Sequence, residues 1–183
     1  MGDERCRETG ATVWLTGLPS SGKSTLARRA ADRLRSGGHR VEVLDGDEIR
    51  GLFGDCGFSR ADRDRHVGRV GWIAGVLARN GVKVLVPVIA PYAAARLSVR
   101  RQHDATGVAF LEVHVAAPVE VCARRDVKGL YRLQREGRLT GLTGVDDPYE
   151  VPERPELHLR TDAASVAESV DELIALLASR GLA

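Results

Sequence analysis

The sequence predicts an α/β fold in which a parallel sheet carries helices on both faces, with a lid segment near residues 126–156. Three observations lead to this prediction. Short apolar runs alternate with segments of helical periodicity, a glycine-rich loop joins the first run to the first helix, and residues 126–156 are charged and lack periodicity. We expect a single domain over residues 1–183, with residues 1–10 forming a flexible N-terminal segment.

The strands are predicted from short runs that are rich in aliphatic and β-branched residues. Proline stands near the end of the third run, where a lost backbone donor is tolerated. The five predicted strands span residues 11–17, 41–45, 82–88, 110–115 and 157–161.

The helices are predicted from apolar residues at spacings of three and four. Gly37 and Gly38 end the first helix, and Pro118 starts the fifth. The predicted helices cover residues 22–36, 47–53, 62–80, 91–103, 118–125 and 165–181, and both tryptophans, Trp14 and Trp72, are expected in the core. The stretch 126–156 is too long for an ordinary loop, which favours a functional lid.

Composition excludes several classes of protein. The formal net charge is +2, too small to indicate binding to nucleic acid or to a membrane surface. The chain has three scattered cysteines without a CxxC pair, which argues against a disulfide framework or a zinc site. Together with a polar start and no run of membrane-spanning length, these features predict a cytoplasmic protein.

The stretch GLPSSGKST fits the pattern G-x-x-x-x-G-K-[ST] between a predicted strand and a predicted helix. In this context, backbone N–H groups wrap a phosphate, the lysine reaches the β- and γ-phosphates, and the serine hydroxyl is placed to bind Mg²⁺. The motif therefore predicts a fold of the P-loop NTPase type and a site for ATP or GTP. The nucleotide-binding residues are Gly17, Leu18, Pro19, Ser20, Ser21, Gly22, Lys23, Ser24 and Thr25.

The motif leaves the phosphate acceptor open. No NKxD-type stretch is present to read guanine, and no DExx box indicates a motor ATPase. Asp45 and Asp47 follow the second strand, at the sheet edge where open parallel sheets bind ligands. There, a carboxylate can hold Mg²⁺ or accept a proton from an attacking hydroxyl, and Arg50 can meet an anionic acceptor.

Seven ordered blocks of this sequence resemble the adenylylsulfate kinase family from about residue 12 to about residue 161. The blocks are TGLPSSGKSTLA, LDGDEIRGLF, GFSRADR, APY, FLEVHV, PVEVCARRDVKGLY and TGVDDPYEVPERPEL. The resemblance implies a kinase that uses ATP and Mg²⁺ to phosphorylate the 3′-hydroxyl of adenosine 5′-phosphosulfate. It also implies a homodimer.

The resemblance also implies roles for individual residues. Lys23, Asp45 and Asp47 are implied to be catalytic, and Ser24 and Asp45 to hold the metal. Phe58 falls where a ring stacks on the adenine of the acceptor, and Lys128 falls in the mobile lid. The residues implied to bind the acceptor are Asp47, Arg50, Phe58, Arg63, His66, Arg69, Ala90, Lys128, Gly129, Leu130 and Leu142.

The sequence departs from the family pattern at five positions on the acceptor side. The family has Asn at His66, Arg at Gly68 and Ala93, Ser at Ala90, and a second aromatic ring at Leu142. These departures motivate a close alternative, a diverged member that phosphorylates the 3′-hydroxyl of another 5′-modified nucleotide. Two alternatives of other kinds are less favoured. The intact Lys23, Ser24, Asp45 and Asp47 argue against a non-catalytic nucleotide-binding or partner-regulating protein, and the kept nucleotide-acceptor blocks argue against an antibiotic-modifying kinase.

Overall fold

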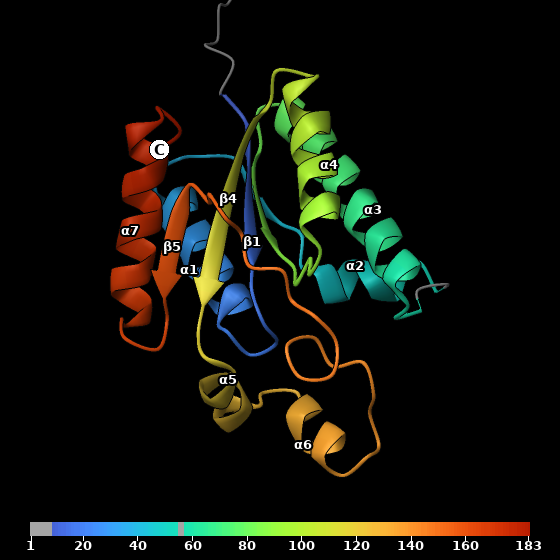
Figure 1. Cartoon of the computed structure of the whole chain (residues 1–183). Helices are drawn as coiled ribbons and strands as arrows, with labels where there is room; N and C mark the ends of the chain where they lie inside the picture. The colour runs from blue at the N-terminus through green and yellow to red at the C-terminus, as the bar shows by residue number, and fades with distance from the viewer. Residues whose placement is uncertain (1–8, 55–56) are drawn as a thin grey trace, which may run out of the picture.

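The computed structural model describes residues 9–54 and 57–183 (Figure 1). Most of the predicted N-terminal segment, together with Cys6 and Cys56, lies outside the described residues. Cys122 is a free, buried thiol. Within the described residues, no helix is both long enough and apolar enough to cross a bilayer.

Five parallel strands form one sheet with the order β2-β3-β1-β4-β5. The first strand lies at the centre, where Val13 is in register with Leu85 on one side and with Leu111 on the other. This arrangement confirms the predicted parallel α/β sheet. The strands are β1 (Ala11–Thr16), β2 (Val41–Val43), β3 (Lys83–Pro87), β4 (Ala109–Ala116) and β5 (Leu157–Arg160).

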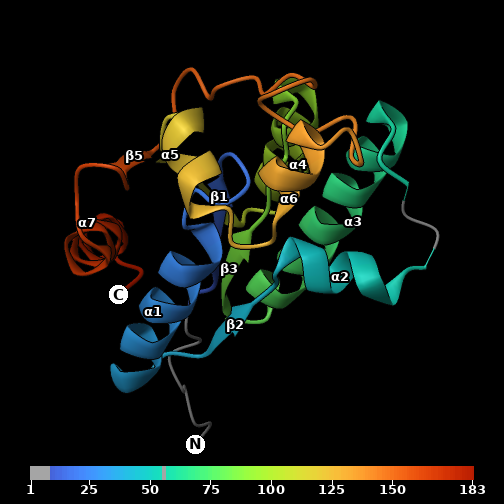
Figure 2. The same cartoon turned by 90° about the horizontal axis from the view of Figure 1, so that it is seen from below.

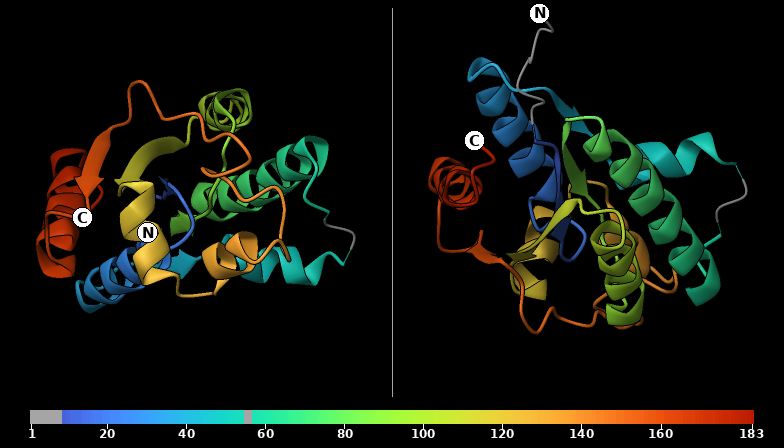
Figure 3. Two further views of the ribbon diagram at one scale, coloured as in Figure 1. Left: turned by 60° about the horizontal axis from the view of Figure 1, so that its bottom comes forward. Right: turned by 90° about the horizontal axis from the view of Figure 1, so that it is seen from above.

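Helices cover both faces of the sheet, as Figures 1 and 3 show. One face carries α1 (Lys23–Ser36) and α7 (Val166–Ser179), and the other carries α3 (Arg60–Arg79) and α4 (Ala93–Asp104). Three short helices complete the chain: α2 (Gly46–Leu52), α5 (Val119–Arg125) and α6 (Leu130–Arg135). The last of these lies in a stretch where the sequence shows no clear periodicity.

Alternating side chains of the central strand divide the core into two layers. Val13 and Leu15 pack with α1 and α7, whereas Trp14 packs with α3 and α4. This alternation is the period of two expected of a strand that is buried on both faces. The prediction that Trp72 belongs to the core is wrong, because its side chain on α3 is 64% exposed.

Most of the lid segment, residues 126–156, lies beyond the carboxyl ends of the strands (Figures 1 and 2). Its end runs back along β4, where the backbone N–H of Glu156 donates a hydrogen bond to the carbonyl oxygen of Glu112. The lid segment has a small core of its own, in which Tyr131 and Leu142 pack against Cys122 and Leu18. Because Leu18 belongs to the glycine-rich loop, this small core joins the lid segment to that loop.

Candidate active site

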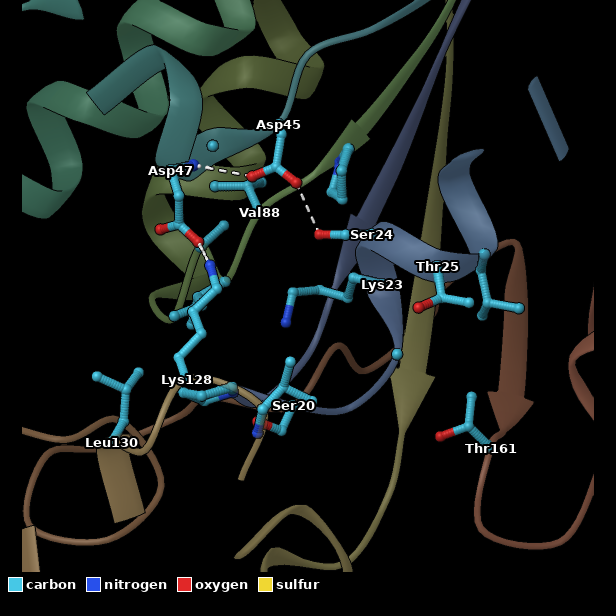
Figure 4. Close-up of a pocket in the computed structure, with 18 of the residues that line it drawn as sticks. Ser20, Lys23, Ser24, Thr25, Asp45, Asp47, Val88, Lys128, Leu130 and Thr161 are labelled. Atoms are coloured by element: carbon cyan, nitrogen blue, oxygen red, sulfur yellow. Dashed lines mark hydrogen bonds and ion pairs between the residues drawn. The ribbon is translucent and has the colours of Figure 1, made fainter. Parts of the chain in front are cut away.

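A cavity of about 840 Å³ lies at the carboxyl ends of the strands. Its wall comes from the glycine-rich loop, from α2 and α3, from the lid segment, and from the turn between β5 and α7. In Figure 4, Thr25 and Thr161 lie on one side of the loop, and Asp47 and Lys128 lie on the other. The cavity therefore has two ends with the glycine-rich loop between them, which suits an enzyme that brings two substrates together.

The backbone of the loop requires glycine at both glycine positions of the motif, Gly17 and Gly22. Gly22 precedes the first residue of α1 with φ of 104°, a conformation that side chains other than glycine rarely adopt. A Cβ atom at Gly17 would lie 2.3 Å from the carbonyl oxygen of Val115. The loop thus passes close to β4 and then enters α1, whose N-terminal N–H groups are a favourable site for a phosphate.

Lys23 is buried in the loop. Its ammonium group donates hydrogen bonds to the carbonyl oxygens of Gly17 at 2.9 Å and Leu18 at 2.7 Å. Burial lowers the pKa of Lys23 to about 8, although the negative charge of Asp47 acts in the opposite direction. The group is therefore mostly protonated at neutral pH and supplies a positive charge in a poorly solvated place.

Ser24, at the start of α1, forms a pair with the carboxylate of Asp45, at the start of α2. Ser24 Oγ donates a hydrogen bond of 2.7 Å to Asp45 Oδ2 (Figure 4). The second carboxylate oxygen of Asp45 accepts a hydrogen bond of 3.0 Å from the backbone N–H of Asp47 and so caps α2. Asp45 is thereby fixed in place, while the side chain of Asp47 extends toward the lid segment and pairs with Lys128.

The predicted acceptor end contains an exposed aromatic ring and a guanidinium group. The ring of Phe58 is 69% exposed, and the Arg50 guanidinium lies over it at 4.9 Å from its centroid. Arg50 also donates a hydrogen bond of 2.7 Å to the carbonyl oxygen of Gly57. An exposed flat ring beside a cation is suited to a nucleotide, which offers a base to stack and an anionic group to pair.

Arg63 lies at the cavity wall, but its hydrogen-bonding groups are already in use. Its Nε donates to the carbonyl oxygen of Phe58 at 2.9 Å, and its Nη2 donates to the carbonyl oxygen of Gly141 at 2.6 Å. The guanidinium also bonds the hydroxyl of Thr143 and pairs with Asp147 at 2.9 Å. In this structure Arg63 ties the Phe58 loop to the lid segment.

His66, on α3, lines the cavity with only 3% of its surface exposed. Its Nδ1 atom is buried and has no hydrogen-bond partner. Burial lowers the pKa of His66 to about 4, and the charge of Arg50 acts in the same direction, whereas the Gly46 backbone and Asp47 oppose the shift. The imidazole is therefore neutral at physiological pH.

The lid segment is attached to the glycine-rich loop by polar contacts as well as by its core. Tyr131 donates a hydrogen bond of 3.0 Å to the carbonyl oxygen of Pro19, and the backbone N–H of Val127 donates to Ser20 Oγ at 3.2 Å. Lys128 and Leu130 line the cavity between the loop and Asp47 (Figure 4).

Most of the residues predicted for the site lie together in the cavity wall. Those in the wall are Pro19, Ser20, Gly22, Lys23, Ser24, Thr25, Asp45, Asp47, Arg50, Phe58, Arg63, His66, Ala90, Lys128 and Leu130. The other predicted residues are Gly17, Leu18, Ser21, Arg69, Gly129 and Leu142, and none of them belongs to it. Arg69 instead lies over the ring of Phe53, 4.8 Å from its centroid.

Leu142, which the resemblance implies to bind the acceptor, lies outside the cavity wall in this structure. Its side chain is buried in the small core of the lid segment and is not part of the cavity wall. Gly68 and Ala93 are also absent from the wall. Of the five departures from the family pattern, only His66 and Ala90 line the cavity.

Sequence reasoning missed the residues at the opposite end of the cavity. Arg125 lies at the end of α5 and donates hydrogen bonds to the carbonyl oxygens of Ser21 and Thr161. Ser169, on the first turn of α7, is 1% exposed, lines the cavity, and has a hydroxyl without a partner. Arg125 belongs to a matching sequence block, but nothing near Ser169 in the sequence marks it as a site residue. The remaining wall residues at this end include Thr161, Ala164 and Val166.

Comparison with known proteins identifies the family to which this chain is similar. The family model for adenylylsulphate kinase matches residues 9–160. An adenylyl-sulfate kinase of Synechococcus sp. (strain JA-2-3B'a(2-13)) is 51% identical over 173 residues, which is 94% of this chain and 97% of the relative.

Solved structures give the same result. The Mycobacterium tuberculosis APS kinase CysC in complex with AMPPNP and APS matches with a TM-score of 0.90 at 44% identity, over 93% of this chain and 98% of that chain. A hexameric APS kinase from Thiobacillus denitrificans matches with a TM-score of 0.73 at 35% identity, over 96% of this chain and 30% of that chain. The chain described here belongs to the adenylylsulphate kinase family.

Proposed function

We propose that this protein transfers the γ-phosphate of ATP to the 3′-hydroxyl of adenosine 5′-phosphosulfate (adenylyl sulfate), giving 3′-phosphoadenylyl sulfate and ADP. The observation that carries this proposal is the two-ended cavity, in which the glycine-rich loop separates Thr161 from Asp47 and Lys128 (Figure 4). The relative of known structure was solved with an ATP analogue and APS together.

The donor nucleotide would place its phosphates against the glycine-rich loop and its base at the end formed by Arg125, Thr161 and Ser169. Lys23 would then exchange its bonds to loop carbonyls for bonds to the β- and γ-phosphates. Its charge stabilises the transferring phosphoryl group most strongly in the transition state, because the ammonium is buried and fixed.

Mg²⁺ fits the donor set formed by Ser24 and Asp45. A hydroxyl oxygen and a carboxylate oxygen lie 2.7 Å apart, and both are hard ligands of the kind that Mg²⁺ prefers. Among the described residues, no group of three or more His, Cys, Asp or Glu side chains could hold a metal. Phosphate oxygens and water would therefore supply the other ligands, and the ion would neutralise charge on the phosphates.

At the acceptor end, Phe58 would stack on the adenine and Arg50 would bind the anionic 5′ group. Asp47 lies beside the loop, where it can orient the attacking hydroxyl and accept its proton. The lid segment would exclude water from the transfer, since its contacts with the glycine-rich loop already hold it over the cavity.

The direct test measures ADP release from Mg·ATP with purified protein, with the phosphorylated product identified by mass spectrometry. The acceptors compared are adenylyl sulfate, AMP, and 5′-diphosphate analogues of cytidine, guanosine and uridine. Rapid turnover with adenylyl sulfate alone supports the proposal. Poor turnover with adenylyl sulfate contradicts it.

A second candidate function is phosphorylation of another 5′-modified nucleotide at its 3′-hydroxyl. It is favoured by His66 and Ala90, the two departures that line the cavity. A clear response to a different nucleotide in the same panel, together with weak turnover of adenylyl sulfate, would support it.

Two further parts of the proposal depend on the sequence and the family. We propose a homodimer, which size-exclusion chromatography with light scattering would test against a monomer or a hexamer. We also propose a cytoplasmic location, on the grounds of the scattered cysteines.

A further inference from the structure

Three buried side-chain atoms among the described residues have no hydrogen-bond partner: Trp14 Nε1, His66 Nδ1 and Ser169 Oγ. A buried polar group without a partner is costly, so each one calls for an explanation. Two of these atoms belong to residues that line the active-site cavity, one at each end. His66 is also one of only two cavity-lining residues that depart from the family pattern.

The surroundings of His66 determine what its free nitrogen can do. The backbone of Gly46 forms a hydrogen bond with the ring that raises the pKa of His66, as a carbonyl acceptor does. Because Nδ1 has no partner, the ring nitrogen that bonds to the Gly46 backbone is Nε2. Nε2 therefore carries the single proton of the neutral ring and donates it to the carbonyl oxygen. Nδ1 is left as an unprotonated nitrogen with a lone pair.

The lone pair of His66 Nδ1 at the cavity wall favours a ligand group that donates a hydrogen bond. It repels an anion and accepts a hydrogen bond from a hydroxyl or an amino group. Arg50 and Lys128, which line the same cavity, carry the positive charge that would pair with the anionic part of the acceptor. His66 is therefore suited to the uncharged part of a nucleotide.

We propose that His66 is a specificity-determining residue of the acceptor site, whose Nδ1 accepts a hydrogen bond from a ribose hydroxyl or an exocyclic amino group of the acceptor nucleotide. This inference rests on the proposed function and deepens it. It accounts for the unpartnered nitrogen at a position where the family pattern has asparagine.

Three substitutions separate the hydrogen bond from the shape of the side chain. His66→Asn places an amide oxygen near the position of Nδ1, whereas His66→Gln places its amide near Nε2, and His66→Leu removes both polar groups. We expect His66→Asn to keep KM for the acceptor within about threefold of wild type, and the other two to raise it about tenfold. KM for ATP should change by less than about twofold in all three.

Acceptor analogues then identify the group that His66 contacts. We would compare wild type and His66→Leu with adenylyl sulfate, with its 2′-deoxy form, and with its purine form that lacks the 6-amino group. The difference between the two proteins should disappear for the one analogue that lacks the contacted group. If it persists with both analogues, or if His66→Leu leaves KM for adenylyl sulfate unchanged, the proposal is overturned.

Failure of the proposed function can be distinguished from failure of the His66 assignment, because it shows in the wild-type protein. If wild type does not turn over adenylyl sulfate, the proposed function fails. The comparison of His66 variants is then made with the nucleotide of the panel that wild type does phosphorylate or, in calorimetric titration, binds. Equal affinity of wild type and His66→Leu for that nucleotide overturns the assignment of His66, as does an absence of binding by any nucleotide of the panel.

Discussion

Lys128 in the lid segment forms an ion pair with Asp47 at the start of α2, 81 residues earlier in the chain. The pair bridges the cavity between the lid segment and the end of the second strand (Figure 4). Both side chains are more than half exposed, at 55% and 66%. Solvent therefore screens the pair, and its contribution to stability is small. Its position between the lid segment and α2 fits our proposal that the lid segment excludes water from the transfer.

Replacing Lys128 by alanine should separate activity from stability. We expect kcat/KM for the acceptor to fall by at least about tenfold, because a charge facing the acceptor is lost. The free energy of unfolding should change by less than about 1 kcal/mol. Steady-state kinetics and urea unfolding measure the two quantities. Arg132→Ala is the matched control, since Arg132 is an exposed cation on α6 outside the cavity wall, and equal kinetics of the two variants would contradict the role of Lys128.

Lys23→Met keeps the length of the side chain and removes its charge. We expect kcat to fall by at least about 100-fold, as is typical when a preorganised electrostatic group is removed from an active site. The variant should remain folded by circular dichroism. Since the folded-state pKa of about 8 is below the ordinary value of 10.5, wild type should gain stability relative to the variant as pH rises from 8 to 10.5. A variant with near-normal kcat would refute the assignment of Lys23.

For Leu142→Phe, the structure predicts the opposite of what an acceptor-binding role would predict. If this residue faced the acceptor base, Leu142→Phe would tighten binding of adenylyl sulfate. Its burial beside Tyr131 and Cys122 predicts instead that the larger ring overpacks the small core of the lid segment. We expect a loss of about 1–3 kcal/mol in the free energy of unfolding and no decrease in KM for the acceptor. Tighter binding without loss of stability would show that Leu142 reaches the base.

The residues around the glycine-rich loop could be predicted from the sequence because their role depends on local geometry. A strand, a loop with glycine at set positions, and a helix place Lys23 and Ser24 through backbone constraints alone. Asp45 could be predicted for a similar reason, since the end of a neighbouring parallel strand meets the same sheet edge.

Side chains placed by contacts distant in sequence could not be predicted in this way. Leu142 and Gly141 are held by Arg63 and by Leu18, which are far from them in the chain. Trp72 stands on the exposed side of α3, and a pattern of apolar spacing does not show which of its members leaves the core. Ser169 enters the cavity wall only because α7 packs on α1.

Ser169→Ala should have opposite effects on stability and on binding of the donor. Removal of a buried hydroxyl without a partner should raise the free energy of unfolding of the nucleotide-free protein by about 1 kcal/mol. If the hydroxyl bonds to the donor base, KM for ATP should rise about three- to tenfold. Ser179→Ala, an exposed position on the same helix, should change neither quantity. Unchanged KM for ATP in Ser169→Ala would remove Ser169 from the donor site.

Two histidines should make the fold sensitive to acid. Burial lowers the pKa of both His66 and His114 from 6.5 to about 4. Between these values the unfolded chain takes up protons that the folded protein does not, so stability falls as pH falls from 6.5 to 4. Each histidine contributes up to about 1.4 kcal/mol per pH unit.

Urea unfolding of wild type, His66→Asn and His114→Asn at pH 6.5, 5.5 and 4.5 measures this effect. Each variant lacks one titrating ring, so its stability should fall less steeply with acid than that of wild type. Between pH 7.5 and 8.5 the three proteins should show parallel dependence on pH, because neither histidine is protonated there in the folded or the unfolded chain. Equal slopes for all three proteins below pH 6.5 would mean that other groups govern the acid sensitivity.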